Sequence, residues 1–157
     1  MDKPQRINSI QEIQDALKEA IEKNVYFAKT KIPVISENSA QIEFTIKNAL
    51  GKLGVVCVVQ TPRLKFFGKA DDCHPVWELT EATIVVSEIP TTNRSRADSS
   101  TALDAALQAA EALHEIGSGI VLGDIYQTEN QGVVSVFLTV KLAVRFCYFR
   151  SDLVDRT

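Results

Sequence analysis

Four residues with chemically active side chains stand side by side in a polar stretch of the sequence: Asp71, Asp72, Cys73 and His74. Carboxylates beside an imidazole suit acid–base catalysis, and an adjacent cysteine and histidine are ligands that zinc accepts. A structural zinc site, however, usually takes four ligands in two spaced pairs. The remaining candidate ligands are scattered along the chain: Cys57, His114 and Cys147. We therefore predict no metal site and interpret the stretch as solvated loop residues.

Basic and aromatic residues alternate just before this stretch: Arg63, Lys65, Phe66, Phe67 and Lys69. Such interleaving is typical of strands on which nucleic-acid bases stack. The chain carries a formal net charge of −3, whereas nucleic-acid-binding domains usually carry a basic excess. We favour a strand edge whose long cationic side chains cover a buried aromatic residue, and we keep a nucleic-acid-binding module as an alternative. Sequence-specific nucleic-acid binding is not expected.

The familiar catalytic motifs are missing from the sequence. Gly51-Lys52 and Gly68-Lys69 lack the rest of a phosphate-binding loop. Gly117-Ser118-Gly119 lacks the spacing of a nucleophile elbow and follows a predicted helix, where glycine commonly ends the helix. His114 falls in the last turn of that helix, where the helix dipole favours a cation. We predict no catalytic residue, no cofactor and no enzymatic activity.

Length and composition predict one globular domain. The chain has 157 residues, of which 45% are hydrophobic, and we expect a single domain over 1–157 with flexible tails at 1–8 and 150–157. No apolar run approaches the roughly 20 residues of a membrane-spanning helix, so no membrane partner is expected. The beginning is polar and lacks the hydrophobic core of a signal peptide. Three cysteines form no disulfide framework, which predicts a protein made in a reducing cytoplasm.

Three segments have the apolar spacing of amphipathic helices. The first covers about residues 10–23 and opens with a capping box in which Ser9 is followed by Glu12. The second has a helical stripe formed by Ile42, Ile46, Ala49, Leu50 and Leu53, and Gly51 or Gly54 can end it. Residues 42–47 also alternate as a strand would, but we favour the helix. The third, Thr101–Ile116, repeats leucine and alanine at helical spacing and stops before Gly117.

Runs rich in β-branched residues predict strands at 32–35, 55–60, 77–89, 120–128 and 133–149. The segment 63–75 is polar and contains a glycine, so we interpret it as a long hairpin loop. The stretch 91–100 is also expected to be a loop. The resulting order is α-β-α-β-β-α-β-β. It predicts an α+β fold in which helices cover one face of a mainly antiparallel sheet that ends in a long C-terminal β-hairpin.

The last predicted strand is unusually long. From Val133 to Phe149 its residues alternate between apolar and mixed positions, and a straight strand of this length would extend roughly 56 Å at about 3.3 Å per residue. A domain of this size has a diameter of roughly 40 Å. We infer from this mismatch that the strand either bends sharply or pairs at its end with another chain, which favours an assembly protein.

Arginines mark a candidate contact loop. Arg94 and Arg96 lie between a strand end and a helix start, and arginine is enriched at protein interfaces. We therefore predict that this loop contacts another subunit or a partner. The other candidate interface residues belong to the end of the long strand: Lys141, Arg145 and Phe149.

Short motifs give the chain a family resemblance. A strand ending in Val85-Val86-Ser87-Glu88-Ile89-Pro90, then Thr92-Asn93-Arg94, then a helix ending in Ala112-Leu113-His114 resembles the tail-terminator (tail-completion) proteins of long-tailed phages and prophages, particularly the Mu-like type. The segment Ile42–Val59 is similar to that family as well. The likeness covers about Ile10–Phe149, although the loop 63–75 departs from it.

The resemblance implies a small α+β subunit that forms a hexameric ring without catalysis. Such a ring caps the phage tail tube, stops its polymerisation and offers a surface to the head–tail connector. The implied partners are further copies of the chain, the tail-tube protein and the connector proteins. The implied location is the host cytoplasm during assembly and then the virion. The alternative is a small cytoplasmic enzyme or ligand-binding domain with a site near Asp71, Asp72 and His74.

Overall fold

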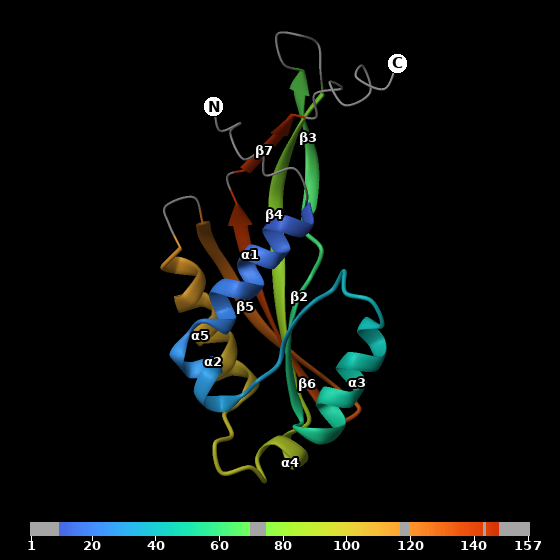
Figure 1. The fold of residues 1–157 in the computed structure, drawn as a ribbon, viewed down its shortest axis with the longest axis vertical. Coiled ribbons are helices and arrows are strands. Elements are labelled where there is room, and N and C mark those ends of the chain that lie inside the picture. Colours follow the sequence, from blue (N-terminus) through green and yellow to red (C-terminus); the bar gives the residue numbers. More distant parts are fainter. Residues whose placement is uncertain (1–9, 70–74, 117–119, 143, 148–157) are drawn as a thin grey trace, which may run out of the picture.

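The computed structural model describes residues 10–69, 75–116, 120–142 and 144–147. In chain order the described elements are α1 (Ile10–Glu22), α2 (Val25–Thr30), β1 (Val34–Ser36), α3 (Ile42–Lys52), β2 (Val55–Val59), β3 (Arg63–Lys69), β4 (Pro75–Glu88), α4 (Pro90–Asn93), α5 (Ala102–His114), β5 (Ile120–Asn130), β6 (Val133–Leu142) and β7 (Val144–Cys147). Figure 1 shows a body of helices and strands from which part of the sheet projects.

The strands form one mixed, mainly antiparallel sheet, which confirms the predicted α+β class. Its main path runs β1-β2-β4-β6-β5, and among the described strand pairs only β1 and β2 run parallel. Strand β4 is the centre of this path, because β2 pairs with one of its edges and β6 with the other. The predicted C-terminal hairpin is present as β5 and β6, which pair antiparallel.

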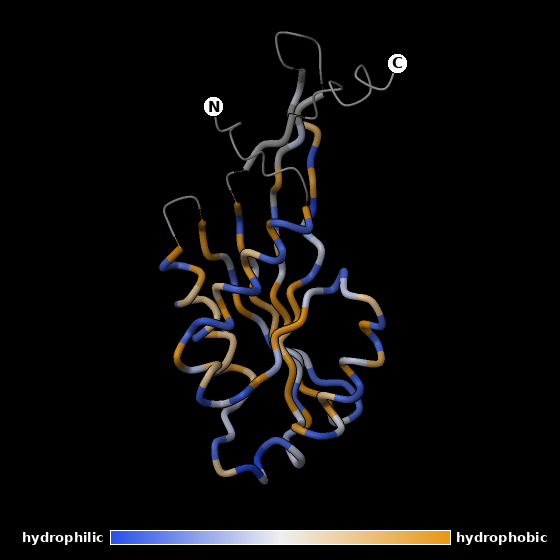
Figure 2. The backbone as a smooth tube through the Cα atoms, viewed as in Figure 1, coloured by the Kyte–Doolittle hydropathy of each residue, from blue (hydrophilic) through white to orange (hydrophobic). Residues whose placement is uncertain are grey.

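The main core lies between the sheet and the helices α1, α2 and α5. Helix α1 buries one stripe against the sheet, formed by Ile13, Leu17 and Ile21. Helix α5 buries a row of alanines, which lets its backbone approach the strands closely. Figure 2 shows hydrophobic residues running along the strands in the middle of the body.

The second face of the sheet is covered in part by α3, so the expectation that all helices pack on one face is wrong. Strand β2 is buried at every position. Val55, Cys57 and Val59 belong to the main core, whereas Val56 and Val58 belong to a smaller core with residues of α3. A strand that is apolar on both faces needs cover on both, and the helix α3 supplies it.

The long C-terminal segment finds its partner within the same chain. It is described as two strands, β6 and β7, on either side of residue 143. Both pair antiparallel with β4, which has 14 residues. The length of the segment therefore does not require another chain, which corrects the inference drawn from the sequence. Position 149, at the end of the predicted strand, lies outside the described residues.

The segment 63–69 is a strand, not the predicted loop. Strand β3 pairs antiparallel with the first half of β4, with a register shift near Gly68. Leu64 and Phe66 alternate with Arg63 and Lys65, which is a strand pattern that the polar composition of the region masked. Together β3, the first half of β4 and β7 form a three-stranded arm that projects beyond the helices (Figure 1).

Two short helices were not predicted. The predicted helix over 10–23 ends at Glu22, and Asn24 begins α2, because its side-chain oxygen accepts a hydrogen bond from the backbone N–H of Tyr26 (2.9 Å). Helix α4 begins with Pro90, whose fixed φ suits the first helical position.

Gly54 offers a test of this packing. Its φ is +76°, and a Cβ built there would lie 2.4 Å from the backbone nitrogen of Asn93. We expect Gly54→Ala to lower the free energy of unfolding by more than about 1 kcal/mol, as measured by urea denaturation. Gly51→Ala is the matched control: the space around it is open within helix α3, so alanine should stabilise by roughly 0.5–1 kcal/mol. Equal effects at both positions would contradict the packing described.

The thiol of Cys57 should be inert in the folded protein. Complete burial raises the pKa of Cys57 to about 12, and the thiolate is the reactive form. At pH 8 we expect no alkylation of the peptide that contains Cys57, and rapid alkylation after addition of denaturant, both followed by mass spectrometry. A small thiol-containing peptide in the same tube shows that the alkylating reagent is active. Labelling of the native protein at the rate of that peptide would show that the core opens freely.

Candidate functional site

The residues first considered for chemistry are not brought together in the described structure. Asp71, Asp72, Cys73 and His74 lie outside the described residues. His114 is exposed in the last turn of α5, as predicted, and Cys57 is buried in β2. Among the described residues, no three histidine, cysteine, aspartate or glutamate side chains are grouped as metal ligands. No described helix is long and apolar enough to cross a membrane.

A buried carboxylate organises the loop that carries the two arginines. Glu88, at the end of β4, is 1% exposed. Its Oε2 accepts a hydrogen bond from the backbone N–H of Ala102 (2.8 Å), at the start of α5. Its Oε1 accepts from the side-chain amide of Asn93 (3.1 Å) and from Nε of Arg94 (3.4 Å). One carboxylate thus joins a strand end, a short helix and the start of α5.

Both arginines of the predicted contact loop bind within their own chain. Arg94 forms an ion pair with Glu88 while most of its side chain stays exposed. Arg96 donates from Nη2 to the backbone carbonyl of Thr30 (2.6 Å), at the end of α2. These contacts hold the loop against the helical layer. The sequence contained no signal for the burial of Glu88, so this intramolecular role of the arginines was missed.

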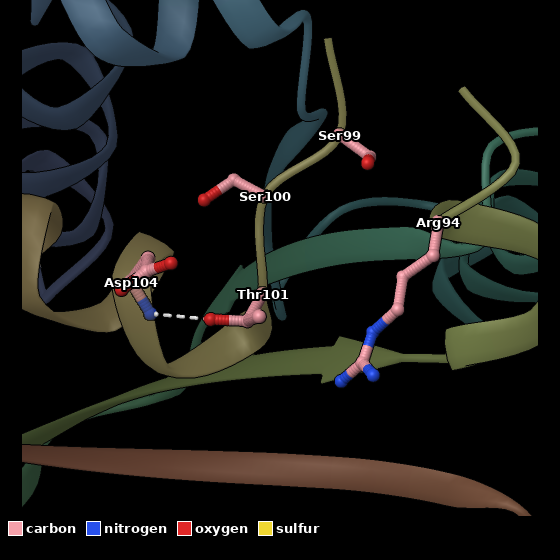
Figure 3. A pocket seen from close by; sticks show the side chains of 5 residues that line it. All are labelled: Arg94, Ser99, Ser100, Thr101 and Asp104. Carbon is pink, nitrogen blue, oxygen red and sulfur yellow. Dashed lines mark hydrogen bonds between the residues drawn. The ribbon is translucent and has the colours of Figure 1, made fainter. Parts of the chain in front are cut away.

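A polar pocket of about 480 Å³ opens beside the start of α5 (Figure 3). It is lined by Arg94, Ser99, Ser100, Thr101 and Asp104. The Thr101 hydroxyl caps the helix by accepting from the backbone N–H of Asp104 (3.1 Å). The helix start already holds the Glu88 carboxylate, which satisfies the positive end of the helix dipole. The polar groups here therefore serve the fold rather than a bound anion.

The arm presents an apolar surface to solvent. We define the arm face as Leu64, Phe66 and Trp77, which are 36%, 51% and 36% exposed. Phe66 lies opposite Trp77 in the β3–β4 register, and their rings meet edge to face at 5.7 Å. The next pair along is Leu64 and Leu79, and Leu79 is fully buried in the main core. The arm face therefore continues the core beyond the helices that cover it.

This exposure bears on one expectation from the sequence. We predicted that the cationic residues of this strand cover a buried aromatic side chain, and Phe66 is not that residue, because about half of it is exposed. Lys65 is exposed too, and alternation along the strand puts it on the opposite side from the arm face. Lys141 is exposed near the end of β6. Arg145 lies in β7 with its backbone opposite Glu78, and Phe149 lies outside the described residues.

A second surface is the outer strand β5. It pairs with β6 alone among the described strands, and nearly all of its residues are exposed. Three large apolar side chains are exposed there: Val121 (58%), Leu122 (37%) and Tyr126 (53%). The Tyr126 ring stacks on Phe137 of β6, with ring centroids 4.8 Å apart. The alternation of the sequence predicted this strand but not its position at the edge of the sheet.

Comparison with known proteins assigns no family. No family model matches the chain, and no curated protein matches it. A solved structure from Akkermansia muciniphila resembles this one with a TM-score of 0.31 and 13% sequence identity, over 90% of this chain and 80% of that chain. The tail-terminator resemblance in the sequence therefore stays a prediction.

Glu88 should matter more to stability than the arginine beside it. In Glu88→Ala the buried Ala102 N–H and the Asn93 amide lose an acceptor, and a buried unsatisfied polar group costs about 1–3 kcal/mol. Arg94 pairs with Glu88 from a largely exposed position, where ion pairs contribute about 0–1 kcal/mol. Urea denaturation should therefore rank Glu88→Ala well below Arg94→Ala in stability. The reverse order would mean that the carboxylate is not the organising group.

Proposed function

We propose that this protein is a structural assembly subunit that caps a phage tail tube as a closed, hexameric ring and joins it to the head–tail connector. The observation that supports the proposal most directly is the arm face, an aromatic and aliphatic surface on a projecting part of the sheet. The tail-terminator resemblance of the sequence supplies the partners. No catalytic step is part of the proposal.

The arm face has the composition of an interface. Aromatic residues are enriched where proteins bind each other, and they dominate the binding energy when they become buried there. Leu64, Phe66 and Trp77 are only partly covered by their own chain. Burial of apolar surface stabilises a complex by roughly 25 cal/mol for each Å² removed from water. Burial of the arm face against a second subunit would therefore favour association.

The two ends of the molecule differ, which suits ring formation. The arm lies at one end of the sheet, while β5 forms the far edge of the body. Subunits that join through two different surfaces form closed rings or open filaments. An edge strand that extends a neighbour's sheet is a common way to build such a contact. The proposed mechanism is therefore geometric. An edge strand of each subunit pairs with the sheet of the next subunit until the ring closes.

The proposed setting follows from the family resemblance. The ring would assemble in the host cytoplasm, then remain in the virion between the tail tube and the head–tail connector. The alternative of an enzyme or ligand-binding domain depends on Asp71, Asp72 and His74. These residues lie outside the described structure, so no observation favours that alternative.

Substitution on the arm tests the assembly role. Phe66→Ser removes the most exposed apolar side chain of the arm face. We expect the variant to stay folded but to lose its oligomers, because the aromatic anchor of the interface is gone. Light scattering coupled to gel filtration measures the mass, and electron microscopy shows whether rings form. Phe44→Ser is the matched control, since Phe44 is 68% exposed on α3, away from the arm.

The capping role needs a separate measurement. The wild-type protein, added to the tail-tube protein encoded in the same genome, should stop tube growth and yield tubes with one capped end by electron microscopy. Phe66→Ser should not. A wild-type protein that stays monomeric at every concentration and leaves tube growth unchanged would refute the proposal.

A further inference from the structure

Among the described strands, β3 and β5 leave one edge each without a strand partner, on opposite sides of the sheet. Strand β3 continues β2 along one edge of β4, while β7 continues β6 along the other edge, with β5 beyond β6. Within the described part of the chain, β3 pairs only with β4, and β5 only with β6. Each outer edge therefore presents backbone N–H and C=O groups that a further strand can bind.

The two edges carry opposite charge. Strand β5 contains Asp124 and Glu129 and neither lysine nor arginine. Strand β3 contains Arg63, Lys65 and Lys69 and no acidic residue. In the backbone register, glutamates of β4 stand opposite the first two of these bases, whereas Lys69 stands opposite Pro75.

The structure assigns a partner to each edge: we infer that β3 of one subunit pairs with β5 of the next. This inference rests on the proposed ring and names the two strands that close it. Pairing β5 with a second β5 would bring acidic residues together, and pairing β3 with a second β3 would bring bases together. Like charges across a strand pair are destabilising, so the charge pattern selects the head-to-tail contact over a symmetric one.

Apolar groups support the same pairing. Strand β3 brings Leu64 and Phe66, and β5 presents Val121 and Tyr126. Side chains that neighbour each other across a strand pair contribute roughly 0.2–1 kcal/mol per pair, aromatic pairs among the strongest. The seven residues of β3 fit along the eleven of β5. The new ladder would place side chains of β5 beside Leu64 and Phe66 of the arm face.

Two features of the β5 edge, a register shift and an acidic residue, oppose pairing with unsuitable strands. The register with β6 shifts between Leu122 and Ile125, and Gly123 lies so close to β6 that an added Cβ would be 3.0 Å from the Thr139 carbonyl oxygen. A bulge and a charge on an edge strand both oppose indiscriminate pairing. Asp124 stands at this bulge. A lysine of an incoming β3 would offset the negative charge of Asp124, whereas an acidic strand would be repelled by it.

Charge reversal tests the pairing. Lys65→Glu with Lys69→Glu makes β3 acidic, and Asp124→Lys with Glu129→Lys makes β5 basic. We expect each double variant alone to need a roughly tenfold or higher concentration for assembly, because like charges then face each other. An equimolar mixture of the two should assemble like the wild type, since acidic β3 meets basic β5 and basic β3 meets acidic β5 in an alternating ring. Light scattering measures the mass in all three samples.

Controls separate a charge effect from a folding effect. Lys47→Glu on α3 and Asp15→Lys on α1 are reversals of exposed residues away from both edges, and they should leave assembly unchanged. Circular dichroism and thermal melting should show all variants folded. The edge pairing would be overturned if the mixture failed to assemble, or if either double variant alone assembled like the wild type. If the wild type still forms a ring in that case, the proposed function stands.

Two other outcomes also decide the matter. A monomeric wild type would remove the proposed ring itself, and the pairing with it. Binding of a single-stranded oligonucleotide by the wild type, lost in Lys65→Glu with Lys69→Glu, would assign the basic edge to nucleic acid instead and overturn the inference.

Discussion

A β-strand has only two hydrogen-bonding edges, and in β4 both are occupied along nearly the whole strand. Strands β3 and β2 follow each other along one edge, while β7 and β6 follow each other along the other. The same strand therefore belongs to the body and to the arm. Helices cover the body half, where one face of β4 is buried in the main core and the other face is only partly buried. The arm half has backbone pairing without helical cover, which is why its apolar residues meet solvent.

Local patterns in the sequence predicted most of the body. The helical spacing of 10–23 and 101–116 and the β-branched runs at 55–60 and 120–128 correspond to described elements within a few residues. Within the arm, the strands over 77–89 and 133–149 were predicted, but β3 was not. The polar composition of 63–75 and its glycine are typical of a loop, and they masked the short alternation of Leu64 and Phe66 with Arg63 and Lys65.

The candidate interface was harder to predict than the fold. Alternation marks which side chains share a face, but it does not say whether another element covers that face. Phe66 therefore has the pattern of a core residue although it lies on the arm. The loop position of Arg94 and Arg96 favoured contacts with a partner and gave no sign that both arginines also bind groups of their own chain. No local pattern in the sequence marks the burial of Glu88, so the partners of the two arginines within the chain could not be predicted.

Three positions from separate parts of the sequence meet where the loop after β4 is anchored. The Gly54 carbonyl accepts from the N–H of Ile89 (2.8 Å), and the Asn93 backbone leaves no room for a side chain at position 54. The Asn93 side chain in turn binds Glu88. Each position admits few amino acids for a reason of its own: space, charge or an amide group. Relatives too divergent for ordinary alignment should therefore keep glycine, glutamate and asparagine here, a sparse signature with which to trace the lineage of this fold through genomes.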